Sequence, residues 1–122
     1  MGTFNIEFEV GDQQRQRFEP IEALVDTGST YTVLPASMLR RLGVQPHRRS
    51  TFELADGTRR DWEMGRTWVR IDGQEEMTLV VFGEEDVQPL LGAVTLEEFL
   101  LAPDPIRQRL VSVNGLLMRF RS

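Results

Sequence analysis

The chain has 122 residues, a net charge of −5 and a pI of about 4.9, and its length suits one domain over residues 1–122 with one hydrophobic core. The acidic balance argues against nucleic-acid binding as the main activity, because phosphate recognition needs clustered positive charge. The chain lacks cysteine, which excludes disulfides and thiol chemistry, and its single histidine, His47, argues against a zinc site.

No stretch is long and apolar enough to span a bilayer, and the N-terminal residues lack the basic-then-apolar pattern of a secretion signal. We therefore expect no membrane partner and a cytoplasmic location. A Ser-His-Asp triad could use only His47, which lies beside Pro46 and two arginines after a predicted helix end. That position disfavours a serine hydrolase.

Short apolar or alternating segments dominate the chain and predict an all-β domain. In the first segment Phe4, Ile6, Phe8 and Val10 share one face, as in a half-buried strand. The segment at 77–82 is almost continuously apolar, which predicts burial on both faces. The expected strands are 3–10, 17–25, 31–34, a hairpin over 51–64, 67–71, 77–82, 87–91, 109–113 and 116–120.

Two short helices are expected between these strands. Residues 35–42 begin with Pro35, which suits a first helical position, and are followed by Gly43 as a stop signal. Residues 95–101 begin with a predicted capping box, in which Thr95 caps the helix and Glu98 reaches back. Asn114-Gly115 predicts a further hairpin turn.

The most informative segment runs from Ala23 to Pro35 and places one carboxylate, Asp26, in a tight turn between two apolar runs. A carboxylate between buried strands is costly unless it is hydrogen-bonded or functional. The turn itself consists of Thr27, Gly28 and Ser29, small residues that allow another backbone to approach closely. The plain alternative is an aspartate that only stabilises its own turn.

The sequence from Leu24 to Ser29, Leu-Val-Asp-Thr-Gly-Ser, resembles the active-site loop of aspartic proteases. Leu90-Leu91-Gly92, followed by a helix-like segment, resembles the apolar-apolar-Gly element of retroviral-type proteases (retropepsins) and their small bacterial relatives. The order of features is similar over residues 4–120. The resemblance implies a closed, six-stranded acid-protease barrel with one or two short helices and a flap hairpin.

The resemblance also implies a homodimer, because pepsin-type enzymes carry two such loops and this chain carries one. Segments 4–8 and 116–120 would interleave with a partner copy; an ordinary intrachain edge strand is the alternative. Two Asp26 carboxylates would share one proton and activate a water, without any metal or cofactor. This chemistry is that of an aspartic endopeptidase acting on an extended peptide or protein substrate.

Further roles follow from the resemblance for the residues around Asp26. The Thr27 hydroxyl would bond across the two-fold axis, and the Gly28 N–H would donate to a carboxylate. Ser29 could donate to the outer carboxylate oxygen. Leu90, Leu91 and Gly92 would pack under the loop and support its geometry.

The hairpin over 50–64 matches the family's flap in position, with Ala55, Asp56, Gly57 and Thr58 at its tip as substrate-binding residues. This tip departs from the glycine-rich viral pattern, and an ordinary surface hairpin is the alternative.

Substrate pockets are expected to be apolar and lined by residues such as Leu34, Val81 and Phe82. Two other functions remain open: a peptide-binding or assembly module with little turnover on the same barrel, and an unrelated barrel in which Asp26 only caps a turn.

Overall fold

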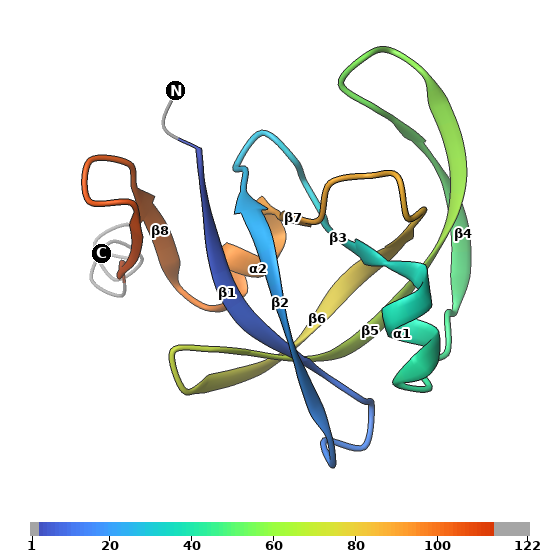
Figure 1. Ribbon diagram of the computed structural model, residues 1–122, viewed down its shortest axis with the longest axis horizontal. Coiled ribbons are helices and arrows are strands. Elements are labelled where there is room, and N and C mark those ends of the chain that lie inside the picture. The colour runs from blue at the N-terminus through green and yellow to red at the C-terminus, as the bar shows by residue number, and fades with distance from the viewer. Residues whose placement is uncertain (1–2, 114–122) are drawn as a thin grey trace, which may run out of the picture.

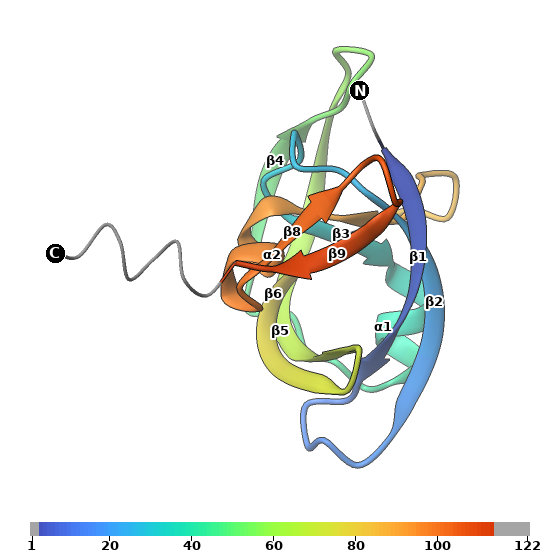
Figure 2. The ribbon, with the colours of Figure 1, turned by 90° about the vertical axis from the view of Figure 1, so that its left-hand side faces the viewer.

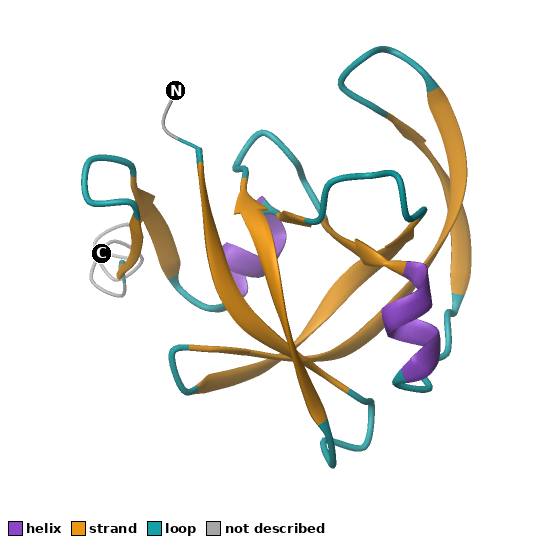
Figure 3. Ribbon diagram, in the orientation of Figure 1, coloured by secondary structure: helices purple, strands orange, loops and turns teal. Residues whose placement is uncertain are grey.

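The computed structural model describes residues 3–113, most of which form β-strands as their alternating apolar pattern predicts (Figures 1 and 3). The elements in chain order are β1 (Phe4–Gly11), β2 (Phe18–Val25), β3 (Thr32–Pro35), α1 (Ala36–Arg41), β4 (Arg48–Glu53), β5 (Arg59–Ile71), β6 (Gln74–Gly83), β7 (Leu90–Leu91), α2 (Ala93–Glu98), β8 (Leu101–Asp104) and β9 (Arg109–Ser112).

The strands close into a barrel. They are ordered β1-β2-β7-β3-β6-β5-β4, and a further antiparallel pairing joins β1 to β5 at Glu9↔Arg70 and Val10↔Val69. This pairing closes a ring of six strands and leaves β4 outside it, where β4 and the first half of β5 form an arched hairpin (Figure 1). The expected all-β, closed six-stranded barrel is therefore confirmed.

The main core fills this barrel and is covered at two places by the helices. Its fully buried side chains include Phe99, Leu34, Leu39, Ile71 and Leu91. A second, smaller cluster lies under the β4–β5 hairpin. Its buried members are Val33, Trp62, Met64, Leu79 and Val81.

The strand expected over 87–91 is reduced to the two residues of β7, and the break expected between residues 64 and 67 is wrong. The sequence predicts a hairpin ending near Met64 and a separate strand over 67–71, but β5 runs unbroken through both segments. Its first half pairs with β4, from Arg59↔Glu53 to Met64↔Arg48, and its second half pairs with β6. One long strand thus joins the outer hairpin to the barrel wall.

The start of the second helix also differs from the prediction. It begins at Ala93, with Gly92 as the N-cap residue and no side-chain cap, so the capping box at Thr95 is wrong. Thr95 instead lies inside the helix with its side chain fully buried. The reason is tertiary: the chain before the helix packs directly on the backbone of the Asp26 loop.

The C-terminal part of the described chain forms a small separate sheet. The strand expected over 109–113 exists as β9, but it pairs with β8, a strand that the sequence did not predict (Figure 2). The expected Asn114-Gly115 turn and the strand over 116–120 lie outside the described residues. β1 pairs with β2 along its whole length, from Phe4↔Val25 to Gly11↔Phe18.

No helix among residues 3–113 has the length and apolar character needed to cross a membrane.

Candidate active site

Asp26 stands where β2 ends, and β7 holds it there. The parallel pairing of β2 with β7 continues one step beyond the strands, because the Asp26 N–H donates to the Leu91 carbonyl oxygen at 3.0 Å. Its own carbonyl accepts from the Ser29 N–H at 3.1 Å and closes a tight turn. Leu91 therefore supports the loop through its backbone, as the sequence predicted for the Leu90-Leu91-Gly92 element.

The Asp26 carboxylate is partly exposed and accepts a hydrogen bond from the Gly28 N–H at 2.9 Å through Oδ1. A Cβ at position 28 would lie 3.2 Å from the same oxygen, so glycine leaves room for this contact. The donation predicted for Gly28 is present. A single chain supplies it, and it is also the bond expected when an aspartate stabilises its own turn.

Gly92 permits the closest backbone approach in the site. A Cβ there would lie 2.4 Å from the Tyr31 carbonyl oxygen and 2.9 Å from the Ser29 oxygen. The same approach lets the first residues of α2 bond to the loop: the Ala93 N–H donates to the Ser29 oxygen at 2.8 Å and the Val94 N–H to the Thr30 oxygen at 3.0 Å. Two backbone hydrogen bonds from the start of α2 thus hold the loop in place.

Three buried threonine hydroxyls lie beneath this junction. Thr95 Oγ1 is 2.6 Å from Thr32 Oγ1 and 2.9 Å from Thr78 Oγ1, and all three side chains are fully buried. Thr32 Oγ1 also accepts from the Gly92 N–H at 3.0 Å. The chain of hydroxyls therefore satisfies a buried backbone donor next to the loop, where an unpaired donor would be costly.

The hydroxyl groups of Thr27 and Ser29, the two other polar residues of the loop, differ in their hydrogen bonding. Thr27 is exposed, and within residues 3–113 its hydroxyl has no hydrogen-bond partner. The Ser29 hydroxyl donates to the Tyr31 carbonyl oxygen at 2.8 Å, so its one proton is not directed at the Asp26 carboxylate. The contact expected between Ser29 and Asp26 is therefore not made in this arrangement.

The predicted flap tip is a well-defined turn between β4 and β5. The Leu54 N–H donates to the Thr58 oxygen at 2.8 Å, and Gly57 has a φ of +89°, a conformation that favours glycine. Asp56 Oδ1 accepts from the Thr58 hydroxyl at 2.7 Å and from the Thr58 N–H at 3.0 Å. These hydrogen bonds hold the pKa of Asp56 below its ordinary value of 3.8, and the bond from the Thr58 hydroxyl has the larger effect.

A cleft of about 980 Å³ separates the Asp26 loop from the flap and brings the predicted site residues together. Asp26, Gly28 and Ser29 line one side of it, and Ala55 and Asp56 line the flap side. Leu90 also lines the cleft, whereas Leu91 and Gly92 are buried behind the loop. Gly57, Thr58 and Thr27 are not among the lining residues.

The apolar lining of the cleft differs in part from the prediction. Val81 faces the cleft as expected, but Leu34 and Phe82 belong to the main core. Their neighbours along the strands take the expected role: Val33 lines the cleft together with Tyr31 and further apolar residues. These are Leu24, Phe52, Leu54, Trp62, Val87 and Leu90.

The sequence missed the aromatic wall of the cleft. The Phe52 ring stacks on Trp62 with centroids 6.0 Å apart and meets the Tyr31 ring edge-on at 6.1 Å. The available signal was the alternation of Arg60, Trp62 and Met64 along β5, which places all three on one face of the strand.

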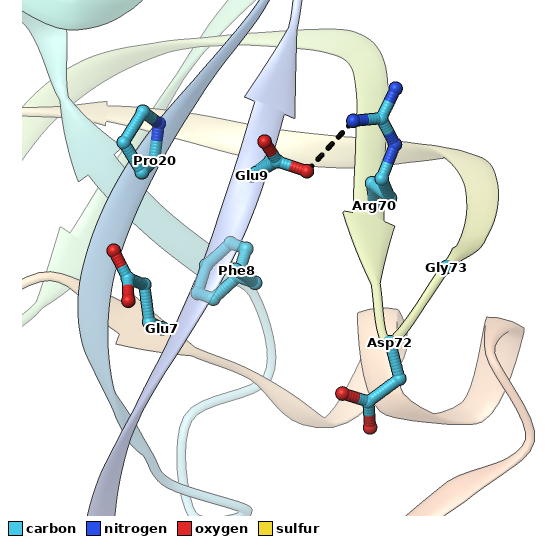
Figure 4. Close-up of a pocket in the computed structure, with 7 residues that line it drawn as sticks. All are labelled: Glu7, Phe8, Glu9, Pro20, Arg70, Asp72 and Gly73. Carbon is cyan, nitrogen blue, oxygen red and sulfur yellow. Dashed lines mark hydrogen bonds and ion pairs between the residues drawn. The ribbon is translucent and has the colours of Figure 1, made fainter.

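A second hollow, of about 380 Å³, lies at the seam between β1 and β5, and Figure 4 shows its lining residues. Glu9 and Arg70 form an ion pair at 2.8 Å across this seam. The hollow contains none of the loop or flap residues. Within residues 3–113 no cluster of three or more histidine or acidic side chains has metal-binding geometry.

The family model described as "gag-polyprotein putative aspartyl protease" matches residues 17–98, which contain the loop, the flap and the Leu90-Leu91-Gly92 element. The chain belongs to this aspartyl protease family. A search of curated proteins gives no match. The fold is similar to the crystal structure of a retropepsin-like aspartic protease from Rickettsia conorii, with a TM-score of 0.53 and 22% sequence identity, over 84% of this chain and 87% of that chain.

Membership of this family accounts for the arrangement of the site. The segment matched by the family model begins just before β2 and ends with α2. It therefore includes both elements that hold Asp26 in place. The retropepsin-like resemblance read from the sequence is confirmed, and the general activity of the family is aspartic proteolysis.

Proposed function

We propose that this protein is an aspartic endopeptidase whose active site is completed by a second copy of the chain. The observation that carries the proposal is one carboxylate, Asp26, at the wall of a cleft that the flap hairpin also lines. The cleft supplies a place for an extended peptide, and the chain supplies half of an acid–base pair.

The exposed Thr27 supports the participation of a second copy. Its hydroxyl lies beside the catalytic candidate and has no partner among the described residues of its own chain. Across a two-fold axis, each Thr27 would meet the same loop of the other subunit, since a two-fold interface is formed by the same surface on both copies. Such a contact would hold the two Asp26 carboxylates at a constant separation.

The paired carboxylates would carry out the chemistry. Two negative charges at close range repel each other, so one carboxyl of the pair would carry a proton while the other is ionised. The ionised member would take a proton from a water held between them as the water oxygen bonds to the scissile carbonyl carbon, and the protonated member would donate its proton to the carbonyl oxygen. The resulting tetrahedral gem-diol would collapse by breaking its C–N bond as a proton passes to the leaving nitrogen and the carbonyl forms again.

The substrate would be an extended peptide with apolar side chains next to the scissile bond. Val33, Val81 and Leu90 line the cleft on the barrel side, and Phe52 and Trp62 line it on the flap side. Burial of an apolar side chain between these surfaces is worth about 1.5 to 3 kcal/mol. Flap closure would exclude bulk water from the reacting bond.

The test is cleavage of a diverse peptide library between about pH 3 and pH 8 by the wild-type protein and by Asp26→Asn. Asp72→Asn is the matched control, because it makes the same chemical change outside the cleft, at a left-handed position (φ 51°) that asparagine tolerates. We expect Asp26→Asn to abolish cleavage and the control to retain it. Cleavage that persists in Asp26→Asn would contradict the proposal.

Subunit mixing tests the contribution of the second copy. If each active site needs two Asp26 residues, adding an equal amount of Asp26→Asn protein and letting the subunits exchange should lower the wild-type activity to about half, because about half of the wild-type subunits then pair with a variant subunit. An enzyme that acts as a monomer would show no change.

The second candidate function is a peptide-binding module without turnover. The apolar and aromatic lining of the cleft favours it, since one chain provides that lining alone. Peptide binding that is equal in the wild-type protein and Asp26→Asn, with no cleavage by either, would establish this second function.

A further inference from the structure

Two segments that line the cleft are joined by an arginine. One is the flap hairpin, and the other is the acidic segment 84–88 that leads into β7, of which Asp86, Val87 and Gln88 line the cleft. Arg60, near the start of β5, forms ion pairs from its Nη1 with Glu84 Oε1 and with Asp86 Oδ1, the second at 3.3 Å. Arg60 and Asp86 both line the cleft.

The segment 84–88 is itself held by the barrel. Glu85 Oε2 accepts from the Ser37 N–H at 3.2 Å in α1, and the Val87 N–H donates to the Glu84 oxygen at 3.0 Å in a turn. The Val87 side chain packs against the apolar cluster under the flap. Arg60 therefore adds an ionic contact between the arched flap and a segment that is also held by the backbone of α1.

The environment of Arg60 keeps its side chain charged and close to both carboxylates. Its side chain is 29% exposed, and its guanidinium carbon lies 6.0 Å from the centre of the Trp62 ring. The hydrogen bond to Asp86, reinforced by Glu84, raises the pKa of the guanidinium, so the side chain stays charged wherever a protease would be assayed. It is the one basic residue among the described residues that line the cleft, which also include Asp26, Glu53 and Asp56.

We propose that Arg60 is a positioning residue that ties the flap to the segment 84–88 and thereby sets the separation of these two segments of the cleft in which substrate binds. The consequence for catalysis depends on the proposed protease function, whereas the structural tie does not. Because Glu84 is 56% and Asp86 67% exposed, the tie is partly screened by salt. Flap mobility and substrate affinity should therefore respond to ionic strength through this residue.

The structural test measures amide hydrogen exchange of the β4–β5 hairpin by mass spectrometry in the Asp26→Asn background, where no proteolysis interferes. Arg60→Gln should speed exchange in this hairpin by about two- to five-fold, the range expected for losing partly exposed ion pairs. Arg59→Gln is the matched control: it removes the same charge from the preceding residue of β5, whose side chain is 75% exposed and does not line the cleft. The ion pair of Arg59, with Glu53 at 4.0 Å, stays within the hairpin and does not reach the segment 84–88.

Reciprocal variants test whether the partners act together. Glu84→Gln combined with Asp86→Asn should reproduce the effect of Arg60→Gln, and all three changes together should add little more. Unchanged exchange in Arg60→Gln, or full additivity of the two sets, would overturn the proposal. Because these measurements use the Asp26→Asn background, they test the contact between the flap and the segment 84–88 even if the protein proves not to be a protease.

The catalytic consequence is tested with the active protein. Arg60→Gln should raise KM about two- to five-fold and leave kcat nearly unchanged, because it weakens the positioning of substrate and touches no reacting atom. Raising the salt from about 0.05 M to about 0.5 M should raise KM of the wild-type protein in the same way and have less effect on the variant. A fall in kcat at constant KM would overturn the assignment of Arg60 as a positioning residue.

Discussion

Replacing Thr95 by valine should destabilise the protein more than the same replacement of any surface threonine. Thr95 is the middle member of the buried hydroxyl chain, and its Oγ1 contacts both Thr32 Oγ1 and Thr78 Oγ1. Valine has nearly the same shape, so the change removes hydrogen bonds and leaves the packing nearly intact. What remains is a Thr78 hydroxyl without its partner and a Thr32 hydroxyl with one contact fewer.

The expected magnitude follows from these contacts. Each of the two hydrogen bonds contributes about 1 kcal/mol, and the buried, unpaired Thr78 hydroxyl adds a desolvation cost of about 1 to 3 kcal/mol. Partial relaxation reduces the sum, so we expect the free energy of unfolding to fall by about 2 to 4 kcal/mol. This is a large part of the 5 to 15 kcal/mol by which domains are typically stable.

The assay is equilibrium unfolding in urea, with Thr30→Val as the control because Thr30 is exposed. The control should change stability by less than about 0.5 kcal/mol. Thr78→Val should cost less than Thr95→Val, since Thr95 then keeps its bond to Thr32. The double variant should cost less than the sum of the two single variants, because no orphaned Thr78 hydroxyl remains. A loss below about 0.5 kcal/mol for Thr95→Val would refute the reasoning.

Two further predictions concern the loop and the flap. Gly92→Ala should destabilise the protein by about 3 kcal/mol or more, because its Cβ would meet backbone atoms that cannot move aside. In urea unfolding it should lower the free energy of unfolding more than Gly73→Ala does, since position 73 has open space around it and bears only the strain of a φ of +83°. An equal or smaller loss for Gly92→Ala would contradict the close approach of the two backbones. The pKa of Asp56 is lower in the folded state than in the unfolded state, so the unfolded chain binds more protons at pH values between the two. The contribution of Asp56 to stability is therefore present above about pH 4 and is lost as the pH falls through the folded-state pKa. An NMR titration of the Asp56 carboxyl carbon should show this lowered pKa. In Thr58→Ala the pKa should rise toward 3.8 without reaching it, because the hydroxyl bond is lost and the backbone N–H bond remains. A pKa at or above 3.8 in the wild-type protein would exclude the turn geometry described for the flap tip.

Local features of the chain could be predicted because their chemistry depends on neighbouring residues. The Asp26 turn needs an aspartate followed two residues later by glycine, and the flap turn needs Asp56-Gly57 at its tip. The alternating pattern of residues 4–10 determines which face of β1 is buried. The order of these elements also sufficed to indicate the family and its barrel.

Contacts between distant segments could not be read in this way. Val33 and Leu34, and likewise Val81 and Phe82, lie on the parallel strands β3 and β6, which are buried on both faces. All four residues are apolar, so no alternation indicates which side chain faces the cleft and which the core. The sequence assigned Leu34 and Phe82 to the cleft for this reason.

By itself, then, the sequence determined the Asp26 turn, the turn at Asp56-Gly57 and the family, because turns and strand patterns are encoded in residues close together along the chain. Only the tertiary structure decided that Thr95 joins a buried hydroxyl chain instead of capping a helix, and that Arg60 meets Glu84 and Asp86. These partners are separated by more than twenty positions in the chain except for Thr78 and Thr95. Their meeting depends on barrel closure, which brings each polar group to a partner that local propensity does not specify.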